Sequence, residues 1–167
     1  MMRLSEAAEM IRASLHGPDA EFSAVSKDSR SIKAGELYVA IRGEHFDGHD
    51  FLQQAAAAGA VGAIVDHVSN VKISQLGVEN TLQALGELAH GWRERFKGRL
   101  IALTGSNGKT TVKEMCRHMI AEVAGASAVL STQGNLNNDI GVPMTLLRLR
   151  DERYAVIEMG ANHLGEI

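Results

Sequence analysis

Cysteine is almost absent from this chain of 167 residues, since Cys116 is the single one. An intramolecular disulfide and a zinc site built on cysteines are therefore excluded, and nothing indicates an oxidising compartment. Long apolar runs are lacking as well. Charged residues interrupt the N-terminal segment, and no later stretch has ~18 uninterrupted apolar residues, which argues against a signal peptide and a membrane span. We expect a cytoplasmic protein.

The chain also lacks an excess of positive charge. Its formal net charge is −3 at pH 7, so the basic surplus of a nucleic-acid binder is missing. Hydrophobic residues make up 45% and charged residues 22%, as in ordinary globular proteins, and the length suits one domain or two small ones. We expect a folded, soluble monomer without a nucleic-acid partner.

Hydrophobic periodicity predicts a small α/β domain over residues 1–79. Ser5 is the expected N-cap of an opening helix that ends at Gly17-Pro18, and Gly59 is the expected stop of an alanine-rich helix. The predicted elements are helices over residues 4–15 and 50–58 and strands over residues 22–25, 37–41 and 61–65.

A long helix over residues 80–98 connects this domain to the next. Asn80 is its expected N-cap, Gln83 stands at the capping-box position, and apolar residues three or four apart continue to about Lys97.

Residues 99–167 have the order of a mainly parallel α/β domain. The predicted strands cover residues 99–104, 128–131 and 154–159, with helices after Gly108 and near Pro143. One apolar face of the first helix is expected to be core; it carries Val112, Met115, Cys116, Met119, Ile120 and Val123. Such sheets usually have five or more strands, so we expect this domain to be incomplete.

The segment from Thr104 to Thr111, TGSNGKTT, lies between a predicted strand and a helix, as a phosphate-binding loop does. Glycines let backbone N–H groups face phosphate oxygens, Lys109 neutralises charge, and the Thr110 hydroxyl suits a Mg²⁺ ligand. The loop is G-x-x-G-K-T, shorter than the common G-x-x-x-x-G-K. The residues expected to hold ATP are Gly105, Ser106, Asn107, Gly108, Lys109, Thr110 and Thr111.

Glu158 ends the last predicted strand, where a second magnesium anchor is expected in an open α/β sheet. A glutamate at a strand end is often only a solvated charge, and its pairing with the loop favours the metal. Another strand is followed by Asn135, Asn137 and Asn138. These asparagines suit either a plain turn or the binding of phosphate or a carboxylate.

Four blocks together resemble one family, the ATP-dependent Mur ligases of peptidoglycan synthesis, nearly end to end. The blocks are Asp28-Ser29-Arg30, Gly43 with Phe46-Asp47-Gly48-His49, Thr104 to Met115, and Gly134 to Leu147 with Glu158 to Ile167. The short phosphate loop is typical of this family. The last two segments resemble the branch that adds D-alanyl-D-alanine to UDP-MurNAc-tripeptide.

The resemblance implies an N-terminal domain that binds the UDP substrate, a central P-loop ATPase domain of which the chain has the first part, and a C-terminal domain that is absent. The implied reaction passes through an acyl phosphate. By resemblance, the UDP-sugar end is held by Ser29, Arg30, Asp47, Gly48 and His49. Asn135, Asn137 and Asn138 would lie near the γ-phosphate and the peptide carboxylate, Thr110 and Glu158 would reach Mg²⁺, and Lys109 and Asn138 are the expected catalytic residues.

Other interpretations stay open beside this one. A sister Mur ligase or folylpolyglutamate synthetase would share the loop. An unrelated P-loop kinase or GTPase is disfavoured because the loop lacks its first glycine. A non-catalytic module that binds a UDP ligand is a candidate of another class.

Overall fold

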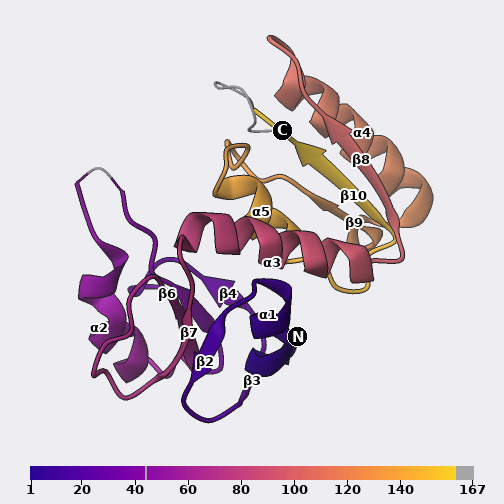
Figure 1. The fold of residues 1–167 in the computed structure, drawn as a ribbon. Helices are drawn as coiled ribbons and strands as arrows, with labels where there is room; N and C mark the ends of the chain where they lie inside the picture. Colours follow the sequence, from indigo (N-terminus) through magenta and orange to yellow (C-terminus); the bar gives the residue numbers. More distant parts are fainter. Residues whose placement is uncertain (44, 161–167) are drawn as a thin grey trace. The chain divides into compact units, whose positions relative to one another are not determined.

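The computed structural model describes residues 1–43 and 45–160, so the last block of the sequence lies outside the described residues from Ala161 onward. Backbone contacts divide the chain into two compact units, Met1–Leu88 and Ala89–Ile167. The helix α3 (Thr81–Arg95) runs across this division (Figure 1).

The first unit is built on a five-stranded sheet of order β2-β7-β6-β5-β4, in which only β2 is antiparallel to its neighbour. A separate antiparallel pair joins β1 to β3. The elements are β1 (Met2–Arg3), α1 (Leu4–Met10), β2 (Ser14–His16), β3 (Glu21–Phe22), β4 (Val25–Ser26), β5 (Leu37–Val39), the 3₁₀ helix η1 (Gly48–Phe51), α2 (Leu52–Ala57), β6 (Gly62–Val65) and β7 (Ser74–Gly77).

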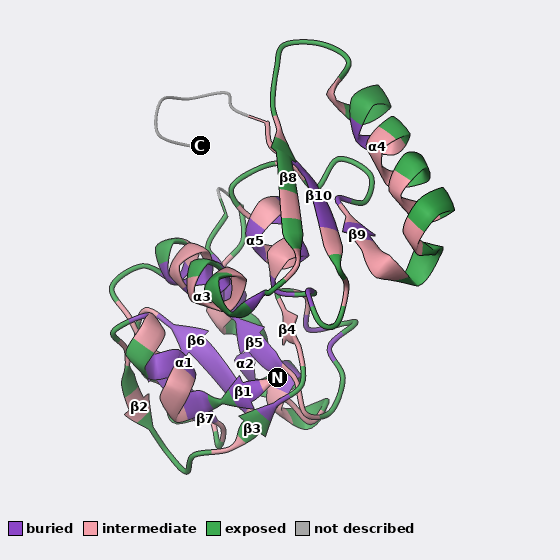
Figure 2. Ribbon diagram, turned by 90° about the vertical axis from the view of Figure 1, so that its right-hand side faces the viewer, coloured by how far each residue is buried: buried purple, intermediate pink, exposed green. Residues whose placement is uncertain are grey.

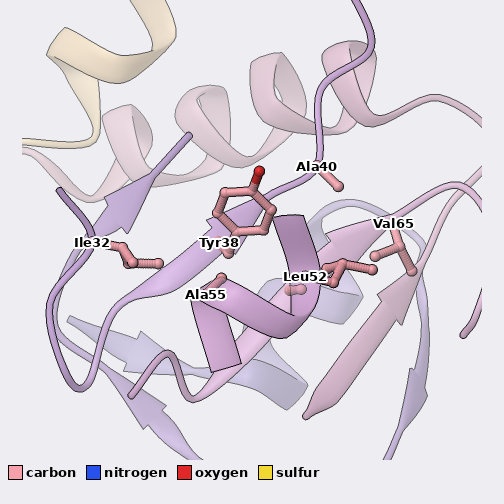
Figure 3. Close-up of a cluster of buried hydrophobic side chains, with 7 residues drawn as sticks. Ile32, Tyr38, Ala40, Leu52, Ala55 and Val65 are labelled. Carbon is pink, nitrogen blue, oxygen red and sulfur yellow. The ribbon is translucent and has the colours of Figure 1, made fainter. Parts of the chain in front are cut away.

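The core of this unit follows the alternation of its strands. On one face, Tyr38 and Val65 pack with Leu52 and Ala55 of α2 (Figure 3). Helix α1 packs on the opposite face of the sheet. A Cβ atom added to Gly62 would lie 2.8 Å from the Leu4 side chain of this helix, so Gly62 leaves room for Leu4. Successive strand residues point to opposite faces, so helices on both sides leave the central strands β5 and β6 fully buried.

The opening helix is shorter than predicted, and Ser5 is not its N-cap. Arg3 occupies the N-cap position, and the helix ends at Met10, before Arg12 takes a positive φ of 52°. Leu15 pairs with Leu76 in the sheet. The helical spacing of Leu15 was therefore misleading, since tertiary pairing overrides a weak local preference.

The strand β7 was missed because its sequence, SQLG, has no apolar pattern. Its two buried polar side chains are satisfied by other segments: the Ser74 hydroxyl donates to the carbonyl oxygen of Pro18 (2.7 Å), and the Gln75 amide donates to that of Ser69 (2.9 Å). Buried polar groups are tolerated when paired in this way.

The predicted start of α3 is confirmed. The Asn80 side chain accepts hydrogen bonds from the N–H groups of Leu82 (2.9 Å) and Gln83 (3.0 Å). The capping box is wrong, because the Gln83 side chain donates to Glu87 one turn later.

The second unit holds three parallel strands in the order β8-β10-β9, with α4 and α5 on opposite faces (Figure 1). Its elements are β8 (Arg99–Leu103), α4 (Lys109–Ala124), the 3₁₀ helix η2 (Ala126–Ala128), β9 (Val129–Ser131), α5 (Gly141–Leu146) and β10 (Tyr154–Glu158). The three predicted strands are confirmed. Leu103 and Glu158 are register partners, so the segments after β8 and β10 begin at the same edge of the sheet.

The predicted core face of α4 is wrong in this chain. Val112, Met115, Met119 and Val123 are 49, 58, 63 and 92% exposed, and Cys116 is only half-buried. Figure 2 shows the exposed side of α4 directed away from the sheet. The helix packs on β9 and β10, and it buries Lys113 there. The periodicity identified an apolar stripe on α4, but it did not show whether another segment covers this stripe.

Candidate functional site

The predicted phosphate loop joins β8 to α4. Gly105 and Gly108 have positive φ angles of 145° and 76°, which glycine adopts without strain. The Lys109 ammonium donates to the carbonyl oxygen of Gly105 (2.7 Å), so the side chain folds over its own loop. Among the described residues, no acceptor engages the backbone N–H groups of residues 106–111. The loop therefore presents donors at a helix N-terminus, as an anion site does.

Glu158 lies beside this loop and is 1% exposed. Its Oε1 atom accepts hydrogen bonds from the Thr110 hydroxyl (3.3 Å) and from the Asn137 amide (2.9 Å). Its Oε2 atom is the one buried side-chain polar atom in the described residues that has no hydrogen-bond partner. A buried carboxylate oxygen left without a hydrogen-bond donor fits a cation ligand, because burying a polar atom that makes no hydrogen bond is costly.

The residues around Glu158 fit a magnesium ion. Mg²⁺ takes oxygen ligands and is usually bound by one or two carboxylates together with phosphate oxygens. Glu158 Oε2 and the Thr110 hydroxyl are oxygens of this kind. The Glu158 N–H donates to the buried Thr132 hydroxyl (2.9 Å), which anchors the end of β10. The expected position of Glu158 is confirmed, and its metal-binding role stays a prediction.

The three asparagines lie in one loop but do different things. Asn137 holds Glu158 through its amide. The Asn138 side chain accepts a hydrogen bond from the N–H of Gly141 (2.8 Å), the first residue of α5. Asn135 is exposed, and its carbonyl oxygen accepts from the Asn137 N–H (2.8 Å). A catalytic role for Asn138 stays a prediction.

Lys113 and Thr132 are parts of this site that the sequence analysis did not single out. The Lys113 ammonium lies 3.8 Å from Glu158 Oε2, and its side chain is almost fully buried. The signal was present, since Lys113 follows Thr110 by three residues and residues at this spacing share one helix face.

In the first unit, Ser29 and Arg30 border a pocket of about 490 Å³. The buried Ser29 hydroxyl donates to Gln54 (3.0 Å), whereas the exposed Arg30 guanidinium makes a bidentate pair with Asp28. Hydrogen bonds from Arg30 hold the pKa of Asp28 well below its usual range. The lining also includes the aromatic rings of Tyr38, Phe46 and Phe51. Of these, only Phe46 belongs to a block that carries the family resemblance.

The segment Asp47-Gly48-His49 lies at the start of η1, and Gly48 is required there by space. A Cβ on Gly48 would lie 2.7 Å from the backbone nitrogen and oxygen of Ile41. The carbonyl oxygen of Gly48 accepts a hydrogen bond from the Tyr38 hydroxyl (3.0 Å). Burial raises the pKa of Tyr38 to about 12. Burial would raise the pKa of Asp47, but hydrogen bonds from His49 outweigh it and lower that pKa.

His49 is also the centre of a charged cluster. Its ring stacks on that of His67 with centroids 4.2 Å apart, and its Nε2 atom lies 3.3 Å from Asp66 Oδ1. His49, Asp66 and His67 bring three ligand atoms within 4.8 Å, a set that could hold a metal. Arg42 already pairs with Asp66 (3.1 Å) and Asp47 (3.1 Å), so a cation is present at this cluster.

The parallel sheet, the short G-x-x-G-K-T loop and the buried carboxylate on the neighbouring strand define the phosphate-loop class of α/β proteins. Two family models match the sequence: the "Mur ligase family, catalytic domain" over residues 21–93 and the "Mur ligase middle domain" over residues 103–166. The chain belongs to the Mur ligase family.

Individual relatives agree with this assignment. The UDP-N-acetylmuramoyl-tripeptide–D-alanyl-D-alanine ligases of Escherichia coli (strain K12) and Haemophilus influenzae are 48 and 46% identical to the chain over 98 and 100% of its length. The chain covers 36 and 38% of them. It thus spans about a third of the length of these relatives.

Solved structures carry the same fold. A crystal structure of MurF from Acinetobacter baumannii has a TM-score of 0.89 at 41% identity, over 97% of this chain and 36% of that one. The MurF ligase of Thermotoga maritima in complex with ADP has a TM-score of 0.77 at 32% identity, over 86% of this chain and 33% of that one. Within the described residues, no helix combines the length and the apolar character needed to cross a bilayer.

Proposed function

We propose that the chain is part of an ATP-dependent ligase that joins D-alanyl-D-alanine to UDP-MurNAc-tripeptide through an amide bond. The observation that carries this proposal is the pairing of the phosphate loop with Glu158, whose buried Oε2 atom has no donor. The MurF ligases, which are named for this reaction, supply the substrate classes.

The second unit would bind the nucleotide. The unengaged N–H groups of residues 106–111 would receive the β- and γ-phosphate oxygens, and Lys109 would leave Gly105 to neutralise their charge. Mg²⁺ would be held by Thr110 and Glu158, and when bound it would offset phosphate charge. The Thermotoga maritima relative was solved in complex with ADP, which supports a nucleotide as the ligand of this fold.

The first unit would bind the UDP part of the other substrate. The pocket beside Ser29 and Arg30 supplies flat rings for a base, and the exposed guanidinium of Arg30 is suited to a diphosphate. Asp47 and His49 would complete this end of the site. These roles are inferred from the family resemblance together with the position of the pocket.

The proposed reaction needs the substrate carboxylate and the γ-phosphate to be aligned, and it needs no side-chain nucleophile. In the proposed reaction the tripeptide carboxylate attacks the γ-phosphorus of ATP, and ADP leaves, to give an acyl phosphate. The amine of D-alanyl-D-alanine then attacks the acyl carbon, and phosphate and a proton are released as the amide bond forms. A carboxylate is a poor nucleophile toward an anionic nucleotide, so the chain contributes charge neutralisation by Lys109 and preorganised N–H dipoles.

A chimera tests the whole proposal. This chain would replace the matching N-terminal segment of the Escherichia coli ligase, to which it is 48% identical. We expect phosphate release from ATP only when UDP-MurNAc-tripeptide and D-alanyl-D-alanine are both present, and none from the same chimera with Lys109→Ala. Release that depends on folate and glutamate, or a folded chimera without release, would contradict the proposal.

A further inference from the structure

The side chain of Lys113 is buried between two carboxylates. It is 1% exposed, and its ammonium lies 3.8 Å from Glu158 Oε2 and 3.3 Å from Glu114 Oε1. It belongs to the turn of α4 that follows Thr110, so its head is directed at the predicted magnesium site and not at solvent. A lysine is rarely buried to this extent unless it is paired.

The two oxygens of Glu158 have different surroundings. Oε1 accepts hydrogen bonds from two neutral donors, Thr110 and Asn137. Oε2 accepts none, and the ammonium of Lys113 is near it but too far for a hydrogen bond. The charge of Glu158 is thus offset by Lys113, while the oxygen itself remains available to a closer ligand.

Glu114 offers the same ammonium a second partner. Its Oε2 atom accepts from Arg117 Nε (2.8 Å), which leaves Oε1 directed at Lys113. Hydrogen bonds from Arg117 outweigh partial burial and, with a smaller contribution from Lys113, lower the pKa of Glu114. Glu114 is therefore a fixed negative charge outside the magnesium site.

We propose that Lys113 is a positioning residue that serves as the cation of the nucleotide-free site, where it offsets the charge of the Glu158 carboxylate. When a divalent ion binds Glu158 Oε2, Lys113 remains paired with Glu114. This inference rests on the proposed function, because it takes Glu158 as a metal ligand. It explains why a fully buried lysine accompanies the proposed Mg²⁺ ligand: each supplies the opposite charge without which the other would be an uncompensated buried ion.

The inference predicts effects of opposite sign on metal affinity. Without Lys113, the ion no longer competes with an ammonium, so Lys113→Met should bind a divalent ion more tightly. Without Glu114, Lys113 depends on Glu158 alone, so Glu114→Gln should bind it more weakly. A lysine with only a structural role would not raise metal affinity when it is removed.

The experiment measures Mn²⁺ binding to this chain by electron paramagnetic resonance at constant pH. The reference protein and all variants carry His67→Ala, which removes one member of the His49, Asp66 and His67 set that could also hold a metal. The variants are Glu158→Gln, Lys113→Met, Glu114→Gln, the Lys113→Met/Glu114→Gln double variant and, as a charge-matched control, Glu122→Gln. Glu122 is an exposed residue near the far end of α4. Circular dichroism reports whether each variant is folded.

We expect Glu158→Gln to abolish binding, Lys113→Met to tighten it about threefold or more, and Glu114→Gln to weaken it about threefold, within the range of single ion pairs. The Glu114→Gln effect should vanish in the Lys113→Met background, and Glu122→Gln should bind as the wild type does. If Lys113→Met does not fold, the Glu114→Gln variant decides. The inference is overturned if Glu114→Gln and Glu122→Gln bind Mn²⁺ with equal affinity.

Two further outcomes separate the inference from the proposed function. Equal binding by the wild type and Glu158→Gln would overturn the magnesium site and the role of Lys113 with it. Loss of binding in Glu158→Gln, with unchanged or weaker binding in a folded Lys113→Met, would overturn the role of Lys113 and leave the magnesium site standing.

Discussion

The side-chain amide of Asn137 donates a 2.9 Å hydrogen bond to Glu158 Oε1, across 21 residues of sequence. Together with Thr110, this bond fixes one carboxylate oxygen, so that the other is the oxygen left for a ligand. The asparagine-rich loop thereby orients a predicted metal ligand, as outer-shell partners do in known metal sites.

Replacing Asn137 by alanine should therefore affect both stability and metal binding. The variant removes a hydrogen bond to a buried charged group, which costs about 1.5 to 3 kcal/mol of unfolding free energy. Urea unfolding checks the loss. Asn135→Ala is the matched control in the same loop, and it should change stability by less than about 0.5 kcal/mol because its side chain is exposed. Equal losses in both variants would contradict the assigned role.

Lys109→Ala should weaken the binding of Mg-ATP to the chain by at least about tenfold, the loss expected for a charge-assisted contact. The fold should survive because, within residues 1–43 and 45–160, the one hydrogen bond of the ammonium is to the carbonyl oxygen of Gly105 in its own loop. Isothermal titration calorimetry measures the affinity. Lys97→Ala, which removes an exposed lysine, should bind as the wild type does. An unchanged affinity in Lys109→Ala would refute the phosphate site.

Gly48→Ala should destabilise the first unit by about 3 kcal/mol or more, because the added Cβ meets the backbone of Ile41 at 2.7 Å and overpacking forces backbone shifts. Gly86→Ala is the control, and its expected effect on stability is opposite to that of Gly48→Ala. Gly86 lies in α3 with nothing within 4 Å of its Cβ position, and alanine there should stabilise the chain by up to about 1 kcal/mol. Thermal unfolding of both variants tests these two predictions. A Gly48→Ala variant as stable as the wild type would rule out the close approach of Gly48 to the backbone of Ile41.

Tyr38 should make stability depend on alkaline pH. Burial raises its pKa to about 12 from an unfolded value of 10.0. The folded state favours the neutral phenol, so its contribution is complete below pH 10 and is lost as the pH rises toward 12. A shift of about two units corresponds to about 2.7 kcal/mol.

Tyr38→Phe should remove this part of the pH dependence, at the cost of about 1 kcal/mol for the hydrogen bond to Gly48. Unfolding free energies on both sides of pH 10 test the prediction. Absorbance of tyrosinate in a Tyr154→Phe background reports Tyr38 alone, since the chain has two tyrosines. Titration of Tyr38 near its ordinary value would contradict the assignment.

Elements with a strong local pattern were predictable. The apolar run before Gly105, the glycines of the loop and the helix behind it gave β8, the loop and the start of α4 in the right order. The position of Glu158 followed because the carboxyl ends of parallel strands meet at one edge. The strand β7 and the end of α1 were not predictable, because distant partners decide them: Pro18 binds Ser74, and Leu76 pairs with Leu15.

By itself, the sequence determined the glycine-rich loop and the strand that carries Glu158, because hydrophobic spacing and glycine positions are local properties of the chain. It also indicated the family, through the resemblance of four blocks of residues. Only the tertiary structure decided that Asn137 and Lys113 contact Glu158 and that Asn138 binds the N–H of Gly141 at the start of α5. Thr110 and Glu158 are 48 residues apart, and Asn137 and Glu158 are 21 apart. Hydrogen bonds and ion pairs over such separations depend on how strands and helices pack, which no local pattern records.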